Sequence, residues 1–356
     1  MDSNTRIPHR GAVSNATGRF ERQRREAFDD GWALDEDDLP PLRTEVAVDA
    51  TRTIIARNES PDIPFDRSIN PYRGCEHGCI YCFARPTHAY LGLSPGLDFE
   101  TRLLAKPDAA KLLEAELRNP RYRPAPIAIG TNTDPYQPVE RRLRIMREIL
   151  EVLAAFRHPV TITTKGALVL RDLDILVPMA AEGLVSVGIS VTTLDRDLAR
   201  TLEPRASVPA ARLQAIRQLA AAGIPTAVMV APIIPAVTEH ELERILEAAA
   251  AAGATSAAYI LLRLPLEVEG LMAEWLQAHA PGRARHVLSL MAQQRGGKAY
   301  DSTFGSRRTG SGPLAGMLAT RFRLACKRLG LEERGMALDC TRFRPPPRAG
   351  DQLALF

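Results

Sequence analysis

Three of the five cysteines in this 356-residue chain lie close together, in the stretch RGCEHGCIYCFARPTH. Cys75, Cys79 and Cys82 have the spacing C-x3-C-x2-C, and Gly74 and Gly78 relieve crowding of the backbone around them. Such a loop can turn three thiolates toward one centre. Thiolates are the usual protein ligands of iron–sulfur clusters, and three of them leave one iron of a 4Fe–4S cluster open. The spacing therefore predicts a 4Fe–4S cluster that can bind a further molecule itself.

Two other interpretations of these cysteines remain open. A structural zinc ion prefers four nitrogen or sulfur ligands, and His77 or His88 could supply the fourth. Structural zinc sites, however, usually combine two separated C-x2-C pairs, which this chain lacks. Alternatively, the thiols could be buried and inert, although the polar residues between them fit an apolar core poorly. The cluster is the favoured interpretation.

The segments that must position this loop alternate between strands and helices. Short apolar or β-branched runs at 68–72, 127–131, 160–164, 184–191, 226–233 and 256–264 are each expected to form a strand, and helical segments separate them. Gly183, Gly223 and Gly253 lie where helix C-caps are expected. Six such units predict an α/β fold, a partial (β/α)6 TIM-like barrel with a parallel sheet. Chemistry in such barrels lies where the strands end, and the cysteine loop follows the first strand.

The chain divides into three expected parts. Residues 1–45 are polar and aperiodic, so we expect a mostly disordered arm. Residues 46–290 form the expected core domain, and residues 291–356 a basic, helical C-terminal extension with a helix over 313–329. Residues 295–356 hold twelve Lys and Arg against five Asp and Glu, although the net charge of the chain is only +4. This surplus indicates either contact with a polyanion such as nucleic acid or a solubilising surface.

Composition narrows the class of protein further. Hydrophobic residues make up 45% of the chain and charged residues 25%, as in an ordinary globular protein. No apolar run approaches the roughly 20 residues that span a bilayer, and the N-terminus has no apolar region typical of a secretory signal. Five cysteines without a disulfide-like spacing fit a reducing compartment. We therefore expect a cytoplasmic protein with no membrane partner.

The cysteine motif resembles that of a known family. C-x3-C-x-aromatic-C, here Cys75, Cys79, Tyr81 and Cys82, is similar to the hallmark of the radical S-adenosylmethionine (radical SAM) superfamily. RGCEHGCIYCFARPTH followed by GTNTDPYQPVE resembles the branch that includes spore photoproduct lyase, over about residues 46–345. The resemblance implies a partial barrel, a 4Fe–4S cluster on the three cysteines, and SAM on the open iron. It also implies reductive cleavage of SAM to a 5′-deoxyadenosyl radical, with electrons from a reductase or a flavodoxin- or ferredoxin-type donor.

The same resemblance implies a set of SAM-binding residues. Tyr81 matches the aromatic residue beside the adenine, Lys165 the lysine that pairs with the SAM carboxylate, and Ser190 a contact to the ribose. Backbone atoms near Ile234 are expected to contact the adenine, whereas Glu239 is expected to be structural. Glu203 and Arg205 either face the cofactor or cap the following helix. Each of these residues could also have a purely structural role, in packing or at the mouth of the barrel.

Two departures from the family pattern bear on function. The Gly-Gly-Glu that usually receives the SAM amino group is replaced by Gly130-Thr131-Asn132-Thr133-Asp134, and Thr131 and Asn132 are the expected acceptors. Spore photoproduct lyase also carries a hydrogen-donating cysteine near this strand end, and here none stands there. The remaining thiols, Cys326 and Cys340, are far along the chain and are expected to be inert, so photoproduct repair is disfavoured.

The substrate is the most open question. The glycine-rich segment 295–312 could close over the barrel with Tyr300, Asp301 and Arg307 or Arg308 in contact with substrate, or could be an ordinary surface connection. The favoured hypothesis is a radical SAM enzyme that acts on an unknown substrate, among which the basic tail favours nucleic acid slightly. The alternatives are a radical SAM enzyme that modifies a protein or peptide, and a non-catalytic zinc or iron–sulfur module.

Overall fold

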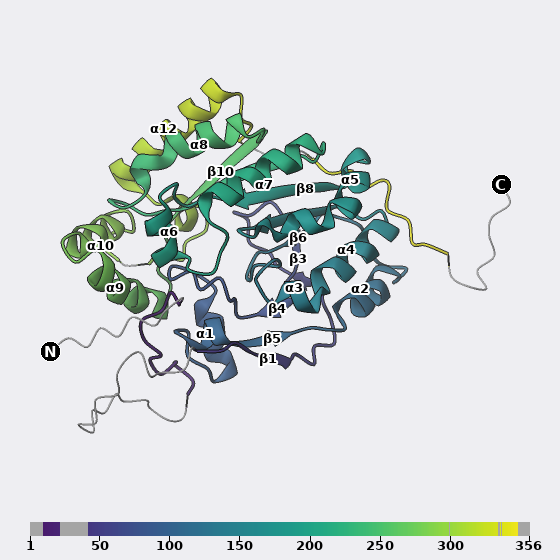
Figure 1. Cartoon of the computed structure of the whole chain (residues 1–356), viewed down its shortest axis with the longest axis horizontal. Coiled ribbons are helices and arrows are strands. Elements are labelled where there is room, and N and C mark those ends of the chain that lie inside the picture. The colour runs from purple at the N-terminus through teal and green to yellow at the C-terminus, as the bar shows by residue number, and fades with distance from the viewer. Residues whose placement is uncertain (1–9, 22–41, 299, 334, 336, 348–356) are drawn as a thin grey trace.

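The computed structural model describes residues 10–21, 42–298, 300–333, 335 and 337–347 (Figure 1). Its main feature is a seven-stranded sheet. In spatial order the strands are β10 (Ser256–Leu261), β9 (Thr226–Ile233), β8 (Val185–Ser190), β7 (Val160–Thr164), β6 (Ile127–Ile129), β3 (Arg67–Ile69) and β2 (Ala56–Arg57). All neighbouring pairs are parallel except β2 and β3. The six parallel strands confirm the predicted α/β fold.

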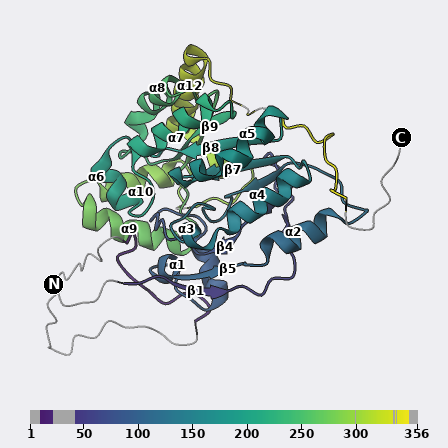
Figure 2. The same cartoon turned by 45° about the vertical axis from the view of Figure 1, so that its right-hand side comes forward.

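Helices connect these strands and cover the sheet. The longer ones are α2 (Ala109–Leu117), α4 (Ile145–Ala155), α5 (Leu173–Ala181), α7 (Pro209–Ala221), α8 (Leu242–Ala251), α9 (Glu267–His279), α10 (Ala284–Gln293) and α12 (Gly312–Leu329). The short ones are η2 (Arg85–Leu91), α1 (Asp98–Thr101), α3 (Glu140–Leu143), η3 (Ala167–Asp172), α6 (Arg196–Leu202), η4 (Glu239–Glu241) and α11 (Ser306–Thr309). Figures 1 and 2 both show α9 and α10 on the side of the molecule away from α2 and α4.

The core forms because each element carries the apolar pattern of its class. In α4 the buried side chains Ile145, Ile149 and Leu153 recur at helical spacing and face the sheet. Strand β8 is buried almost throughout, as expected of a central parallel strand covered on both faces. Gly183, Gly223 and Gly253 all have positive φ just after a helix, which confirms the predicted C-cap positions.

A second, three-stranded sheet was not predicted. It consists of β1 (Glu45–Val48), β5 (Arg102–Ala105) and β4 (Tyr72–Arg73), in the order β1-β5-β4. The expected first strand at 68–72 is therefore wrong in extent, because β3 ends at Ile69 and Tyr72 pairs instead with Ala105 in the small sheet. The chain crosses from one sheet to the other immediately before the cysteine loop.

The predicted N-terminal arm and C-terminal helix can be compared with the structure where these segments are described. Residues 10–21 pack against the body of the protein, with Ala12 only 1% exposed, so disorder is the wrong description for this piece of the arm. Residues 42–45 of the arm are described as well, and β1 begins at Glu45. The remainder of the arm, residues 1–9 and 22–41, lies outside the described residues. At the other end, α12 matches the helix expected over 313–329. It packs on α8, with Arg321 paired to Glu243, and the centre of the Phe322 ring lies 4.7 Å from that of Tyr259 in a tilted contact.

Candidate functional site

The cysteine loop follows β4 at the edge where the parallel strands end. Cys75 and Cys79 are buried, Cys82 is half-buried, and all three are free thiols. Two tight turns shape the loop, in which the Gly78 N–H donates to Cys75 O (3.2 Å) and the Cys82 N–H to Cys79 O (3.2 Å). Gly78 has φ +66° and a Cβ there would lie 2.7 Å from Glu100 Oε2, so only glycine fits this position.

The surroundings of Cys75 and Cys79 disfavour their free anions. Burial raises the pKa of both thiols well above that of a free thiol. The charge of Asp134 raises the pKa of Cys75 further, whereas the ammonium group of Lys165 opposes the rise at Cys79. In the part of the chain that the structure describes, no three His, Cys, Asp or Glu side chains are grouped to hold a single metal ion. A 4Fe–4S cluster differs from a single ion, because each cysteine binds an iron of its own.

A buried ion pair supports the loop from one side. Arg85, in η2, is fully buried and pairs with Glu100 of α1. Its other donors bind carbonyl oxygens of the loop itself, Gly78 O (3.0 Å) and Cys79 O (2.9 Å). Glu100 in turn accepts the backbone N–H groups of Gly11 (3.0 Å) and Ala12 (2.9 Å). The N-terminal segment is thereby fastened to the cysteine loop through one carboxylate.

The segment after β6 supports the loop from the other side. Gln137 accepts the N–H of Glu76 (2.8 Å) and donates to Gly74 O (3.3 Å), so its amide spans the start of the loop. Thr133 Oγ1 donates to Tyr72 O (3.0 Å). The stretch GTNTDPYQPVE therefore has a structural explanation, since it positions the cysteines.

Asp134, in the same stretch, connects the loop to the end of β7. It is 3.2 Å from His77 Nδ1, and it accepts hydrogen bonds from Thr164 Oγ1 (2.6 Å) and the Lys165 N–H (2.7 Å). Burial alone would raise the pKa of Asp134, but the charge of His77 and these hydrogen bonds outweigh it and hold the pKa well below its usual range. Asp134 is thus an ionised group that fixes the loop relative to the strand that carries Lys165.

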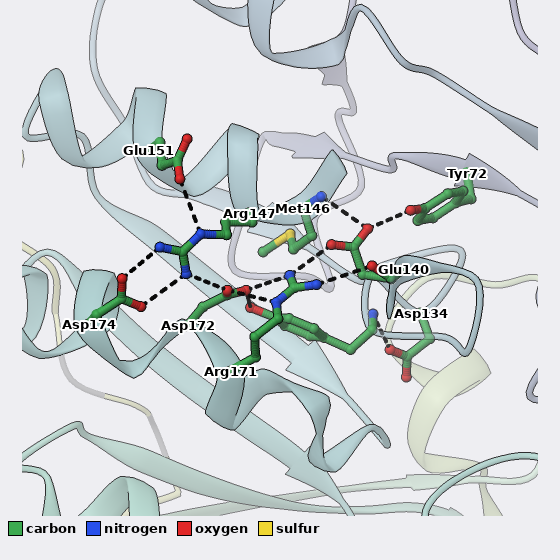
Figure 3. A network of polar contacts seen from close by, with 10 residues as sticks. Tyr72, Asp134, Glu140, Met146, Arg147, Glu151, Arg171, Asp172 and Asp174 are labelled. Atoms are coloured by element: carbon green, nitrogen blue, oxygen red, sulfur yellow. Dashed lines mark hydrogen bonds and ion pairs between the residues drawn. The ribbon is translucent and has the colours of Figure 1, made fainter. Parts of the chain in front are cut away.

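A larger polar network lies behind this segment (Figure 3). Glu140 accepts the hydroxyl of Tyr72 (2.5 Å) and pairs with Arg171 (2.8 Å). Asp172 pairs with both Arg171 (2.8 Å) and Arg147 (3.0 Å). The network joins β4, α3, α4 and η3, so the strand that leads into the cysteine loop is anchored to the helical layer.

Lys165 and Tyr81, two of the expected SAM contacts, lie close together. Lys165 Nζ lies 5.7 Å from the centre of the Tyr81 ring. Among the described residues, no carboxylate lies within ion-pair distance of this ammonium group. Its backbone is held by Asp134, whereas its charge is available to an external anion.

Glu203 has a structural place beside Tyr81. Its carboxylate is buried, accepts the hydroxyls of Tyr81 and Thr192, and pairs with Arg212. Arg212 also donates to the backbone oxygen of Ser190 (3.1 Å), at the end of β8. Glu203 therefore orients Tyr81 and the end of β8 and does not cap the next helix. Arg205, by contrast, pairs with Glu76 in the cysteine loop (3.0 Å).

The other expected SAM contacts differ in how free their polar groups are. Thr131 and Asn132 are half-exposed, and Asn70 bonds both the Thr131 hydroxyl (3.2 Å) and the Asn132 N–H (3.0 Å). Ile234 is fully buried; its N–H is taken by Thr238 Oγ1 (2.9 Å) and its C=O by the Thr238 N–H (2.8 Å). A contact of Ile234 with adenine would therefore have to use its apolar side chain.

The comparisons with known proteins identify the family. Residues 69–249, a little over half of the chain, match the Radical SAM superfamily. The chain belongs to the radical SAM superfamily. It is 43% identical over 230 residues to an uncharacterised protein of Mycobacterium bovis, a match that covers 63% of this chain and 68% of that protein. It is 26% identical over 173 residues to an uncharacterised protein of Methanocaldococcus jannaschii, covering 49% of this chain and 62% of that one.

The fold of this radical SAM enzyme is that of spore photoproduct lyase. One solved lyase structure aligns over 81% of this chain and 80% of its own, with TM-score 0.59 and 18% identity. Another, with bound AdoMet and a dinucleoside spore photoproduct, gives a TM-score of 0.60 at 17% identity. This likeness confirms the predicted partial barrel. A 4Fe–4S cluster and SAM are the typical cofactors of the superfamily, and the donor set here, three thiols and an unpaired ammonium group, fits both.

Each histidine of the zinc alternative has one ring nitrogen beside another protein group, whereas His88 Nδ1 has no hydrogen-bond partner among the described residues. His88 Nε2 lies 2.9 Å from Arg102 O, and His77 faces Asp134. Sequence reasoning missed Arg85, Glu100 and Gln137, which hold the loop in place, and Asn70, which holds Thr131 and Asn132. Arg85 and Gln137 lie inside the quoted motif stretches, so their place there was the available signal; nothing local distinguished Asn70 or Glu100.

Proposed function

We propose that Cys75, Cys79 and Cys82 bind a 4Fe–4S cluster and that its open iron takes SAM, held also by Tyr81, Thr131, Asn132, Lys165, Ser190 and Ile234. When bound, these groups supply reductive cleavage of SAM to a 5′-deoxyadenosyl radical, which removes a hydrogen atom from the substrate. One observation carries this proposal. A loop of three free thiols is held in place by Arg85 and Glu100 on one side and by Gln137 on the other. The ammonium group of Lys165, which has no ion-pair partner among the described residues, lies beside this loop, near Tyr81.

The residues of the chain have separate tasks in this proposal. Lys165 neutralises the carboxylate of SAM. Asp134 accepts the backbone N–H of Lys165 and so fixes the place at which the Lys165 side chain begins. Tyr81 offers a ring face to the adenine, and its hydroxyl is tied down by Glu203. The hydroxyl of Thr131 and the side-chain amide of Asn132 can accept from the SAM amino group.

We propose nucleic acid as the substrate. The basic surplus of residues 295–356 supports this, as does the fold shared with a lyase that is solved with a dinucleoside photoproduct. Photoproduct repair itself is not proposed, because no cysteine stands at the end of β6. Cys326 is buried in α12, where burial raises its pKa to about 11, and Cys340 is held at Leu338 O. A protein or peptide substrate is the alternative.

The remaining parts of the proposal concern the surroundings of the enzyme. A flavodoxin- or ferredoxin-type protein or a reductase would supply the electron. A cytoplasmic location is proposed because free thiols and a cluster need a reducing compartment. No helix among the described residues has the length and apolar character that crossing a bilayer requires. We further propose that residues 46–290 form the core domain and that residues 291–356 form an extension. Helix α12 of the extension packs against α8 of the core domain.

The test compares two sets of cysteine variants after anaerobic reconstitution. The wild type should hold about four irons and four sulfides per chain. The triple variant Cys75→Ala/Cys79→Ala/Cys82→Ala should hold none, whereas the control Cys326→Ala/Cys340→Ala should match the wild type. SAM should then change the electron paramagnetic resonance spectrum of the reduced wild type. Retention of iron by the triple variant, or an unchanged spectrum at saturating SAM, contradicts the proposal.

A further inference from the structure

A cluster of arginines and aromatic rings lies beside the cysteine loop, and the proposed cofactor site does not use it. Arg263 lies two residues after the end of β10, between the buried residues Leu262 and Leu264. Its guanidinium carbon is 4.9 Å from the centre of the Phe83 ring and 6.0 Å from that of Tyr300. Because Phe83 is the residue after Cys82, the Arg263 cluster adjoins the site where the cysteines would hold their cofactor.

Arg263 is a half-buried cation that has no ion-pair partner among the residues that the structure describes. Its Nε is buried with no hydrogen-bond partner, and among the described residues no carboxylate forms an ion pair with it. Burial is the largest cause and lowers the pKa of Arg263; Tyr300 opposes it, and the charges of Arg307 and Arg308 lower the pKa further. An unpaired cation in such a place costs free energy of folding, which an anionic ligand would offset.

The neighbouring charges leave the cluster positive. Arg307 is neutralised by Asp62, which binds its Nε at 2.6 Å. Arg308 donates to the carbonyl oxygen of Asp62 (2.5 Å). Arg295 donates to the carbonyl oxygens of Leu262 and Ser306, and its own Nε has no partner. A second carboxylate, that of Asp301, binds Thr303 and Ser306 and acts on Arg295 by its charge. The four arginines Arg263, Arg295, Arg307 and Arg308 against Asp62 and Asp301 still leave the cluster positive.

Exposed rings accompany these charges. Phe83 is 45% exposed and Phe304 is 54% exposed, and the guanidinium carbon of Arg307 lies 4.6 Å from the centre of the Phe304 ring. Surfaces that bind single-stranded nucleic acid combine cations along the backbone with aromatic faces on which bases stack. Sequence analysis had singled out Tyr300, Arg307 and Arg308, but neither Phe83 nor Arg263.

We propose that the Arg263 cluster binds a phosphodiester of a single nucleic acid strand, with Arg263 as the phosphate ligand and Phe83 as the ring on which the adjacent base stacks. The guanidinium fork matches the oxygens of a phosphate, and the strand would then lie with its bases at the cysteine loop. This inference rests on the proposed nucleic acid substrate and deepens it, because it assigns the residues that recognise that substrate.

The test is binding of a fluorescein-labelled thymidine dodecamer to the reconstituted protein, followed by fluorescence anisotropy at several salt concentrations. Arg263→Gln should weaken binding on the order of 10- to 100-fold, as expected for the loss of a charge-assisted contact. It should also reduce the slope of log affinity against log salt by about 0.7. Arg263→Lys should bind at an intermediate level, and Phe83→Leu should weaken binding without changing the slope. The exposed Arg328→Gln on α12 is the matched control and should bind like the wild type.

Thermal unfolding separates this role from a structural one. An arginine needed for the fold lowers the unfolding midpoint when it is removed, whereas removal of an unpaired half-buried cation leaves the midpoint unchanged or raises it. Arg263→Gln should therefore lose binding but not stability. A lowered midpoint together with normal binding per folded molecule overturns the inference.

The remaining outcomes distinguish this inference from the proposed function. If the wild type binds the dodecamer and Arg263→Gln binds it equally well, the cluster is not the phosphate site, and the proposed nucleic acid substrate stands. If the wild type binds no dodecamer, both proposals fail. If free thymidine monophosphate displaces the labelled dodecamer as well as the unlabelled dodecamer does, the ligand of the site is a single nucleotide. That result overturns the proposal of a nucleic acid strand. Binding of a polyglutamate peptide in place of the dodecamer overturns it in favour of an acidic peptide.

Discussion

Replacing Arg85 by methionine tests the support of the cysteine loop most directly. The side chains of Arg85 and Glu100 are both fully buried. Arg85 donates to the carbonyl oxygens of Gly78, Cys79, Pro95 and Gly96 as well as to Glu100. Methionine has a similar length but no donor, so the variant leaves the Glu100 carboxylate without its cation and four carbonyl groups without this partner.

The expected loss follows from the burial of the pair. Removing one partner of a buried ion pair typically costs about 3–5 kcal/mol, because the remaining charge stays buried and uncompensated. The Gly11 and Ala12 N–H groups still solvate part of the Glu100 charge, so the lower half of this range, about 3–4 kcal/mol, is expected. The free energy of unfolding of a typical protein is only about 5–15 kcal/mol, so the variant should still fold but with a markedly lower stability.

The measurement is urea unfolding of the cluster-free protein, followed by circular dichroism, together with iron content after reconstitution. Arg328→Met is the control, because Arg328 and Glu247 form an exposed pair whose loss should cost less than about 1 kcal/mol. Arg85→Met/Glu100→Leu should be less destabilised than Arg85→Met alone, since it leaves no unpaired buried charge. If Arg85→Met costs no more than the control and keeps its full iron content, the pair does not hold the loop.

Three further results are expected. Lys165→Ala should weaken SAM binding by about 1.5–3 kcal/mol, on the order of 10- to 100-fold, while Asp134 keeps its backbone bond; equal affinity, measured by equilibrium dialysis against the surface control Lys111→Ala, would refute the carboxylate role. Burial lowers the pKa of His158 from 6.5 to about 4, so its neutral form stabilises the fold above pH 6.5. That contribution, up to about 3 kcal/mol, should be lost as pH falls toward 4, and His158→Gln should unfold with a shallower acid dependence; identical pH profiles would show that His158 does not titrate in this way. With SAM and a strong reductant, the protein should form 5′-deoxyadenosine slowly but should not repair thymine photoproduct in an oligonucleotide, and efficient repair would contradict the assignment of Cys326 and Cys340 as inert.

The sequence by itself determined the cysteine loop and the alternation of strands and helices. Both are local properties, because a C-x3-C-x2-C spacing, an apolar period and a glycine after a helix are all read within a few residues. Strand β9 and helix α12 accordingly fall almost where they were expected. The prediction for Lys165 and Tyr81 also depended on place along the chain, since each follows or lies in a recognisable segment.

The tertiary structure alone decided how the loop is held and what stands beside it. The β1-β5-β4 sheet and the docking of residues 10–21 join segments far apart in the chain. Arg263 and Phe83 likewise meet only because β10 ends beside the cysteine loop. Such contacts leave no periodic trace in the sequence, because they depend on the order in which the strands are arranged in space. From the sequence, a single glutamate such as Glu100 is expected to be exposed, and only the fold shows that it is buried against Arg85.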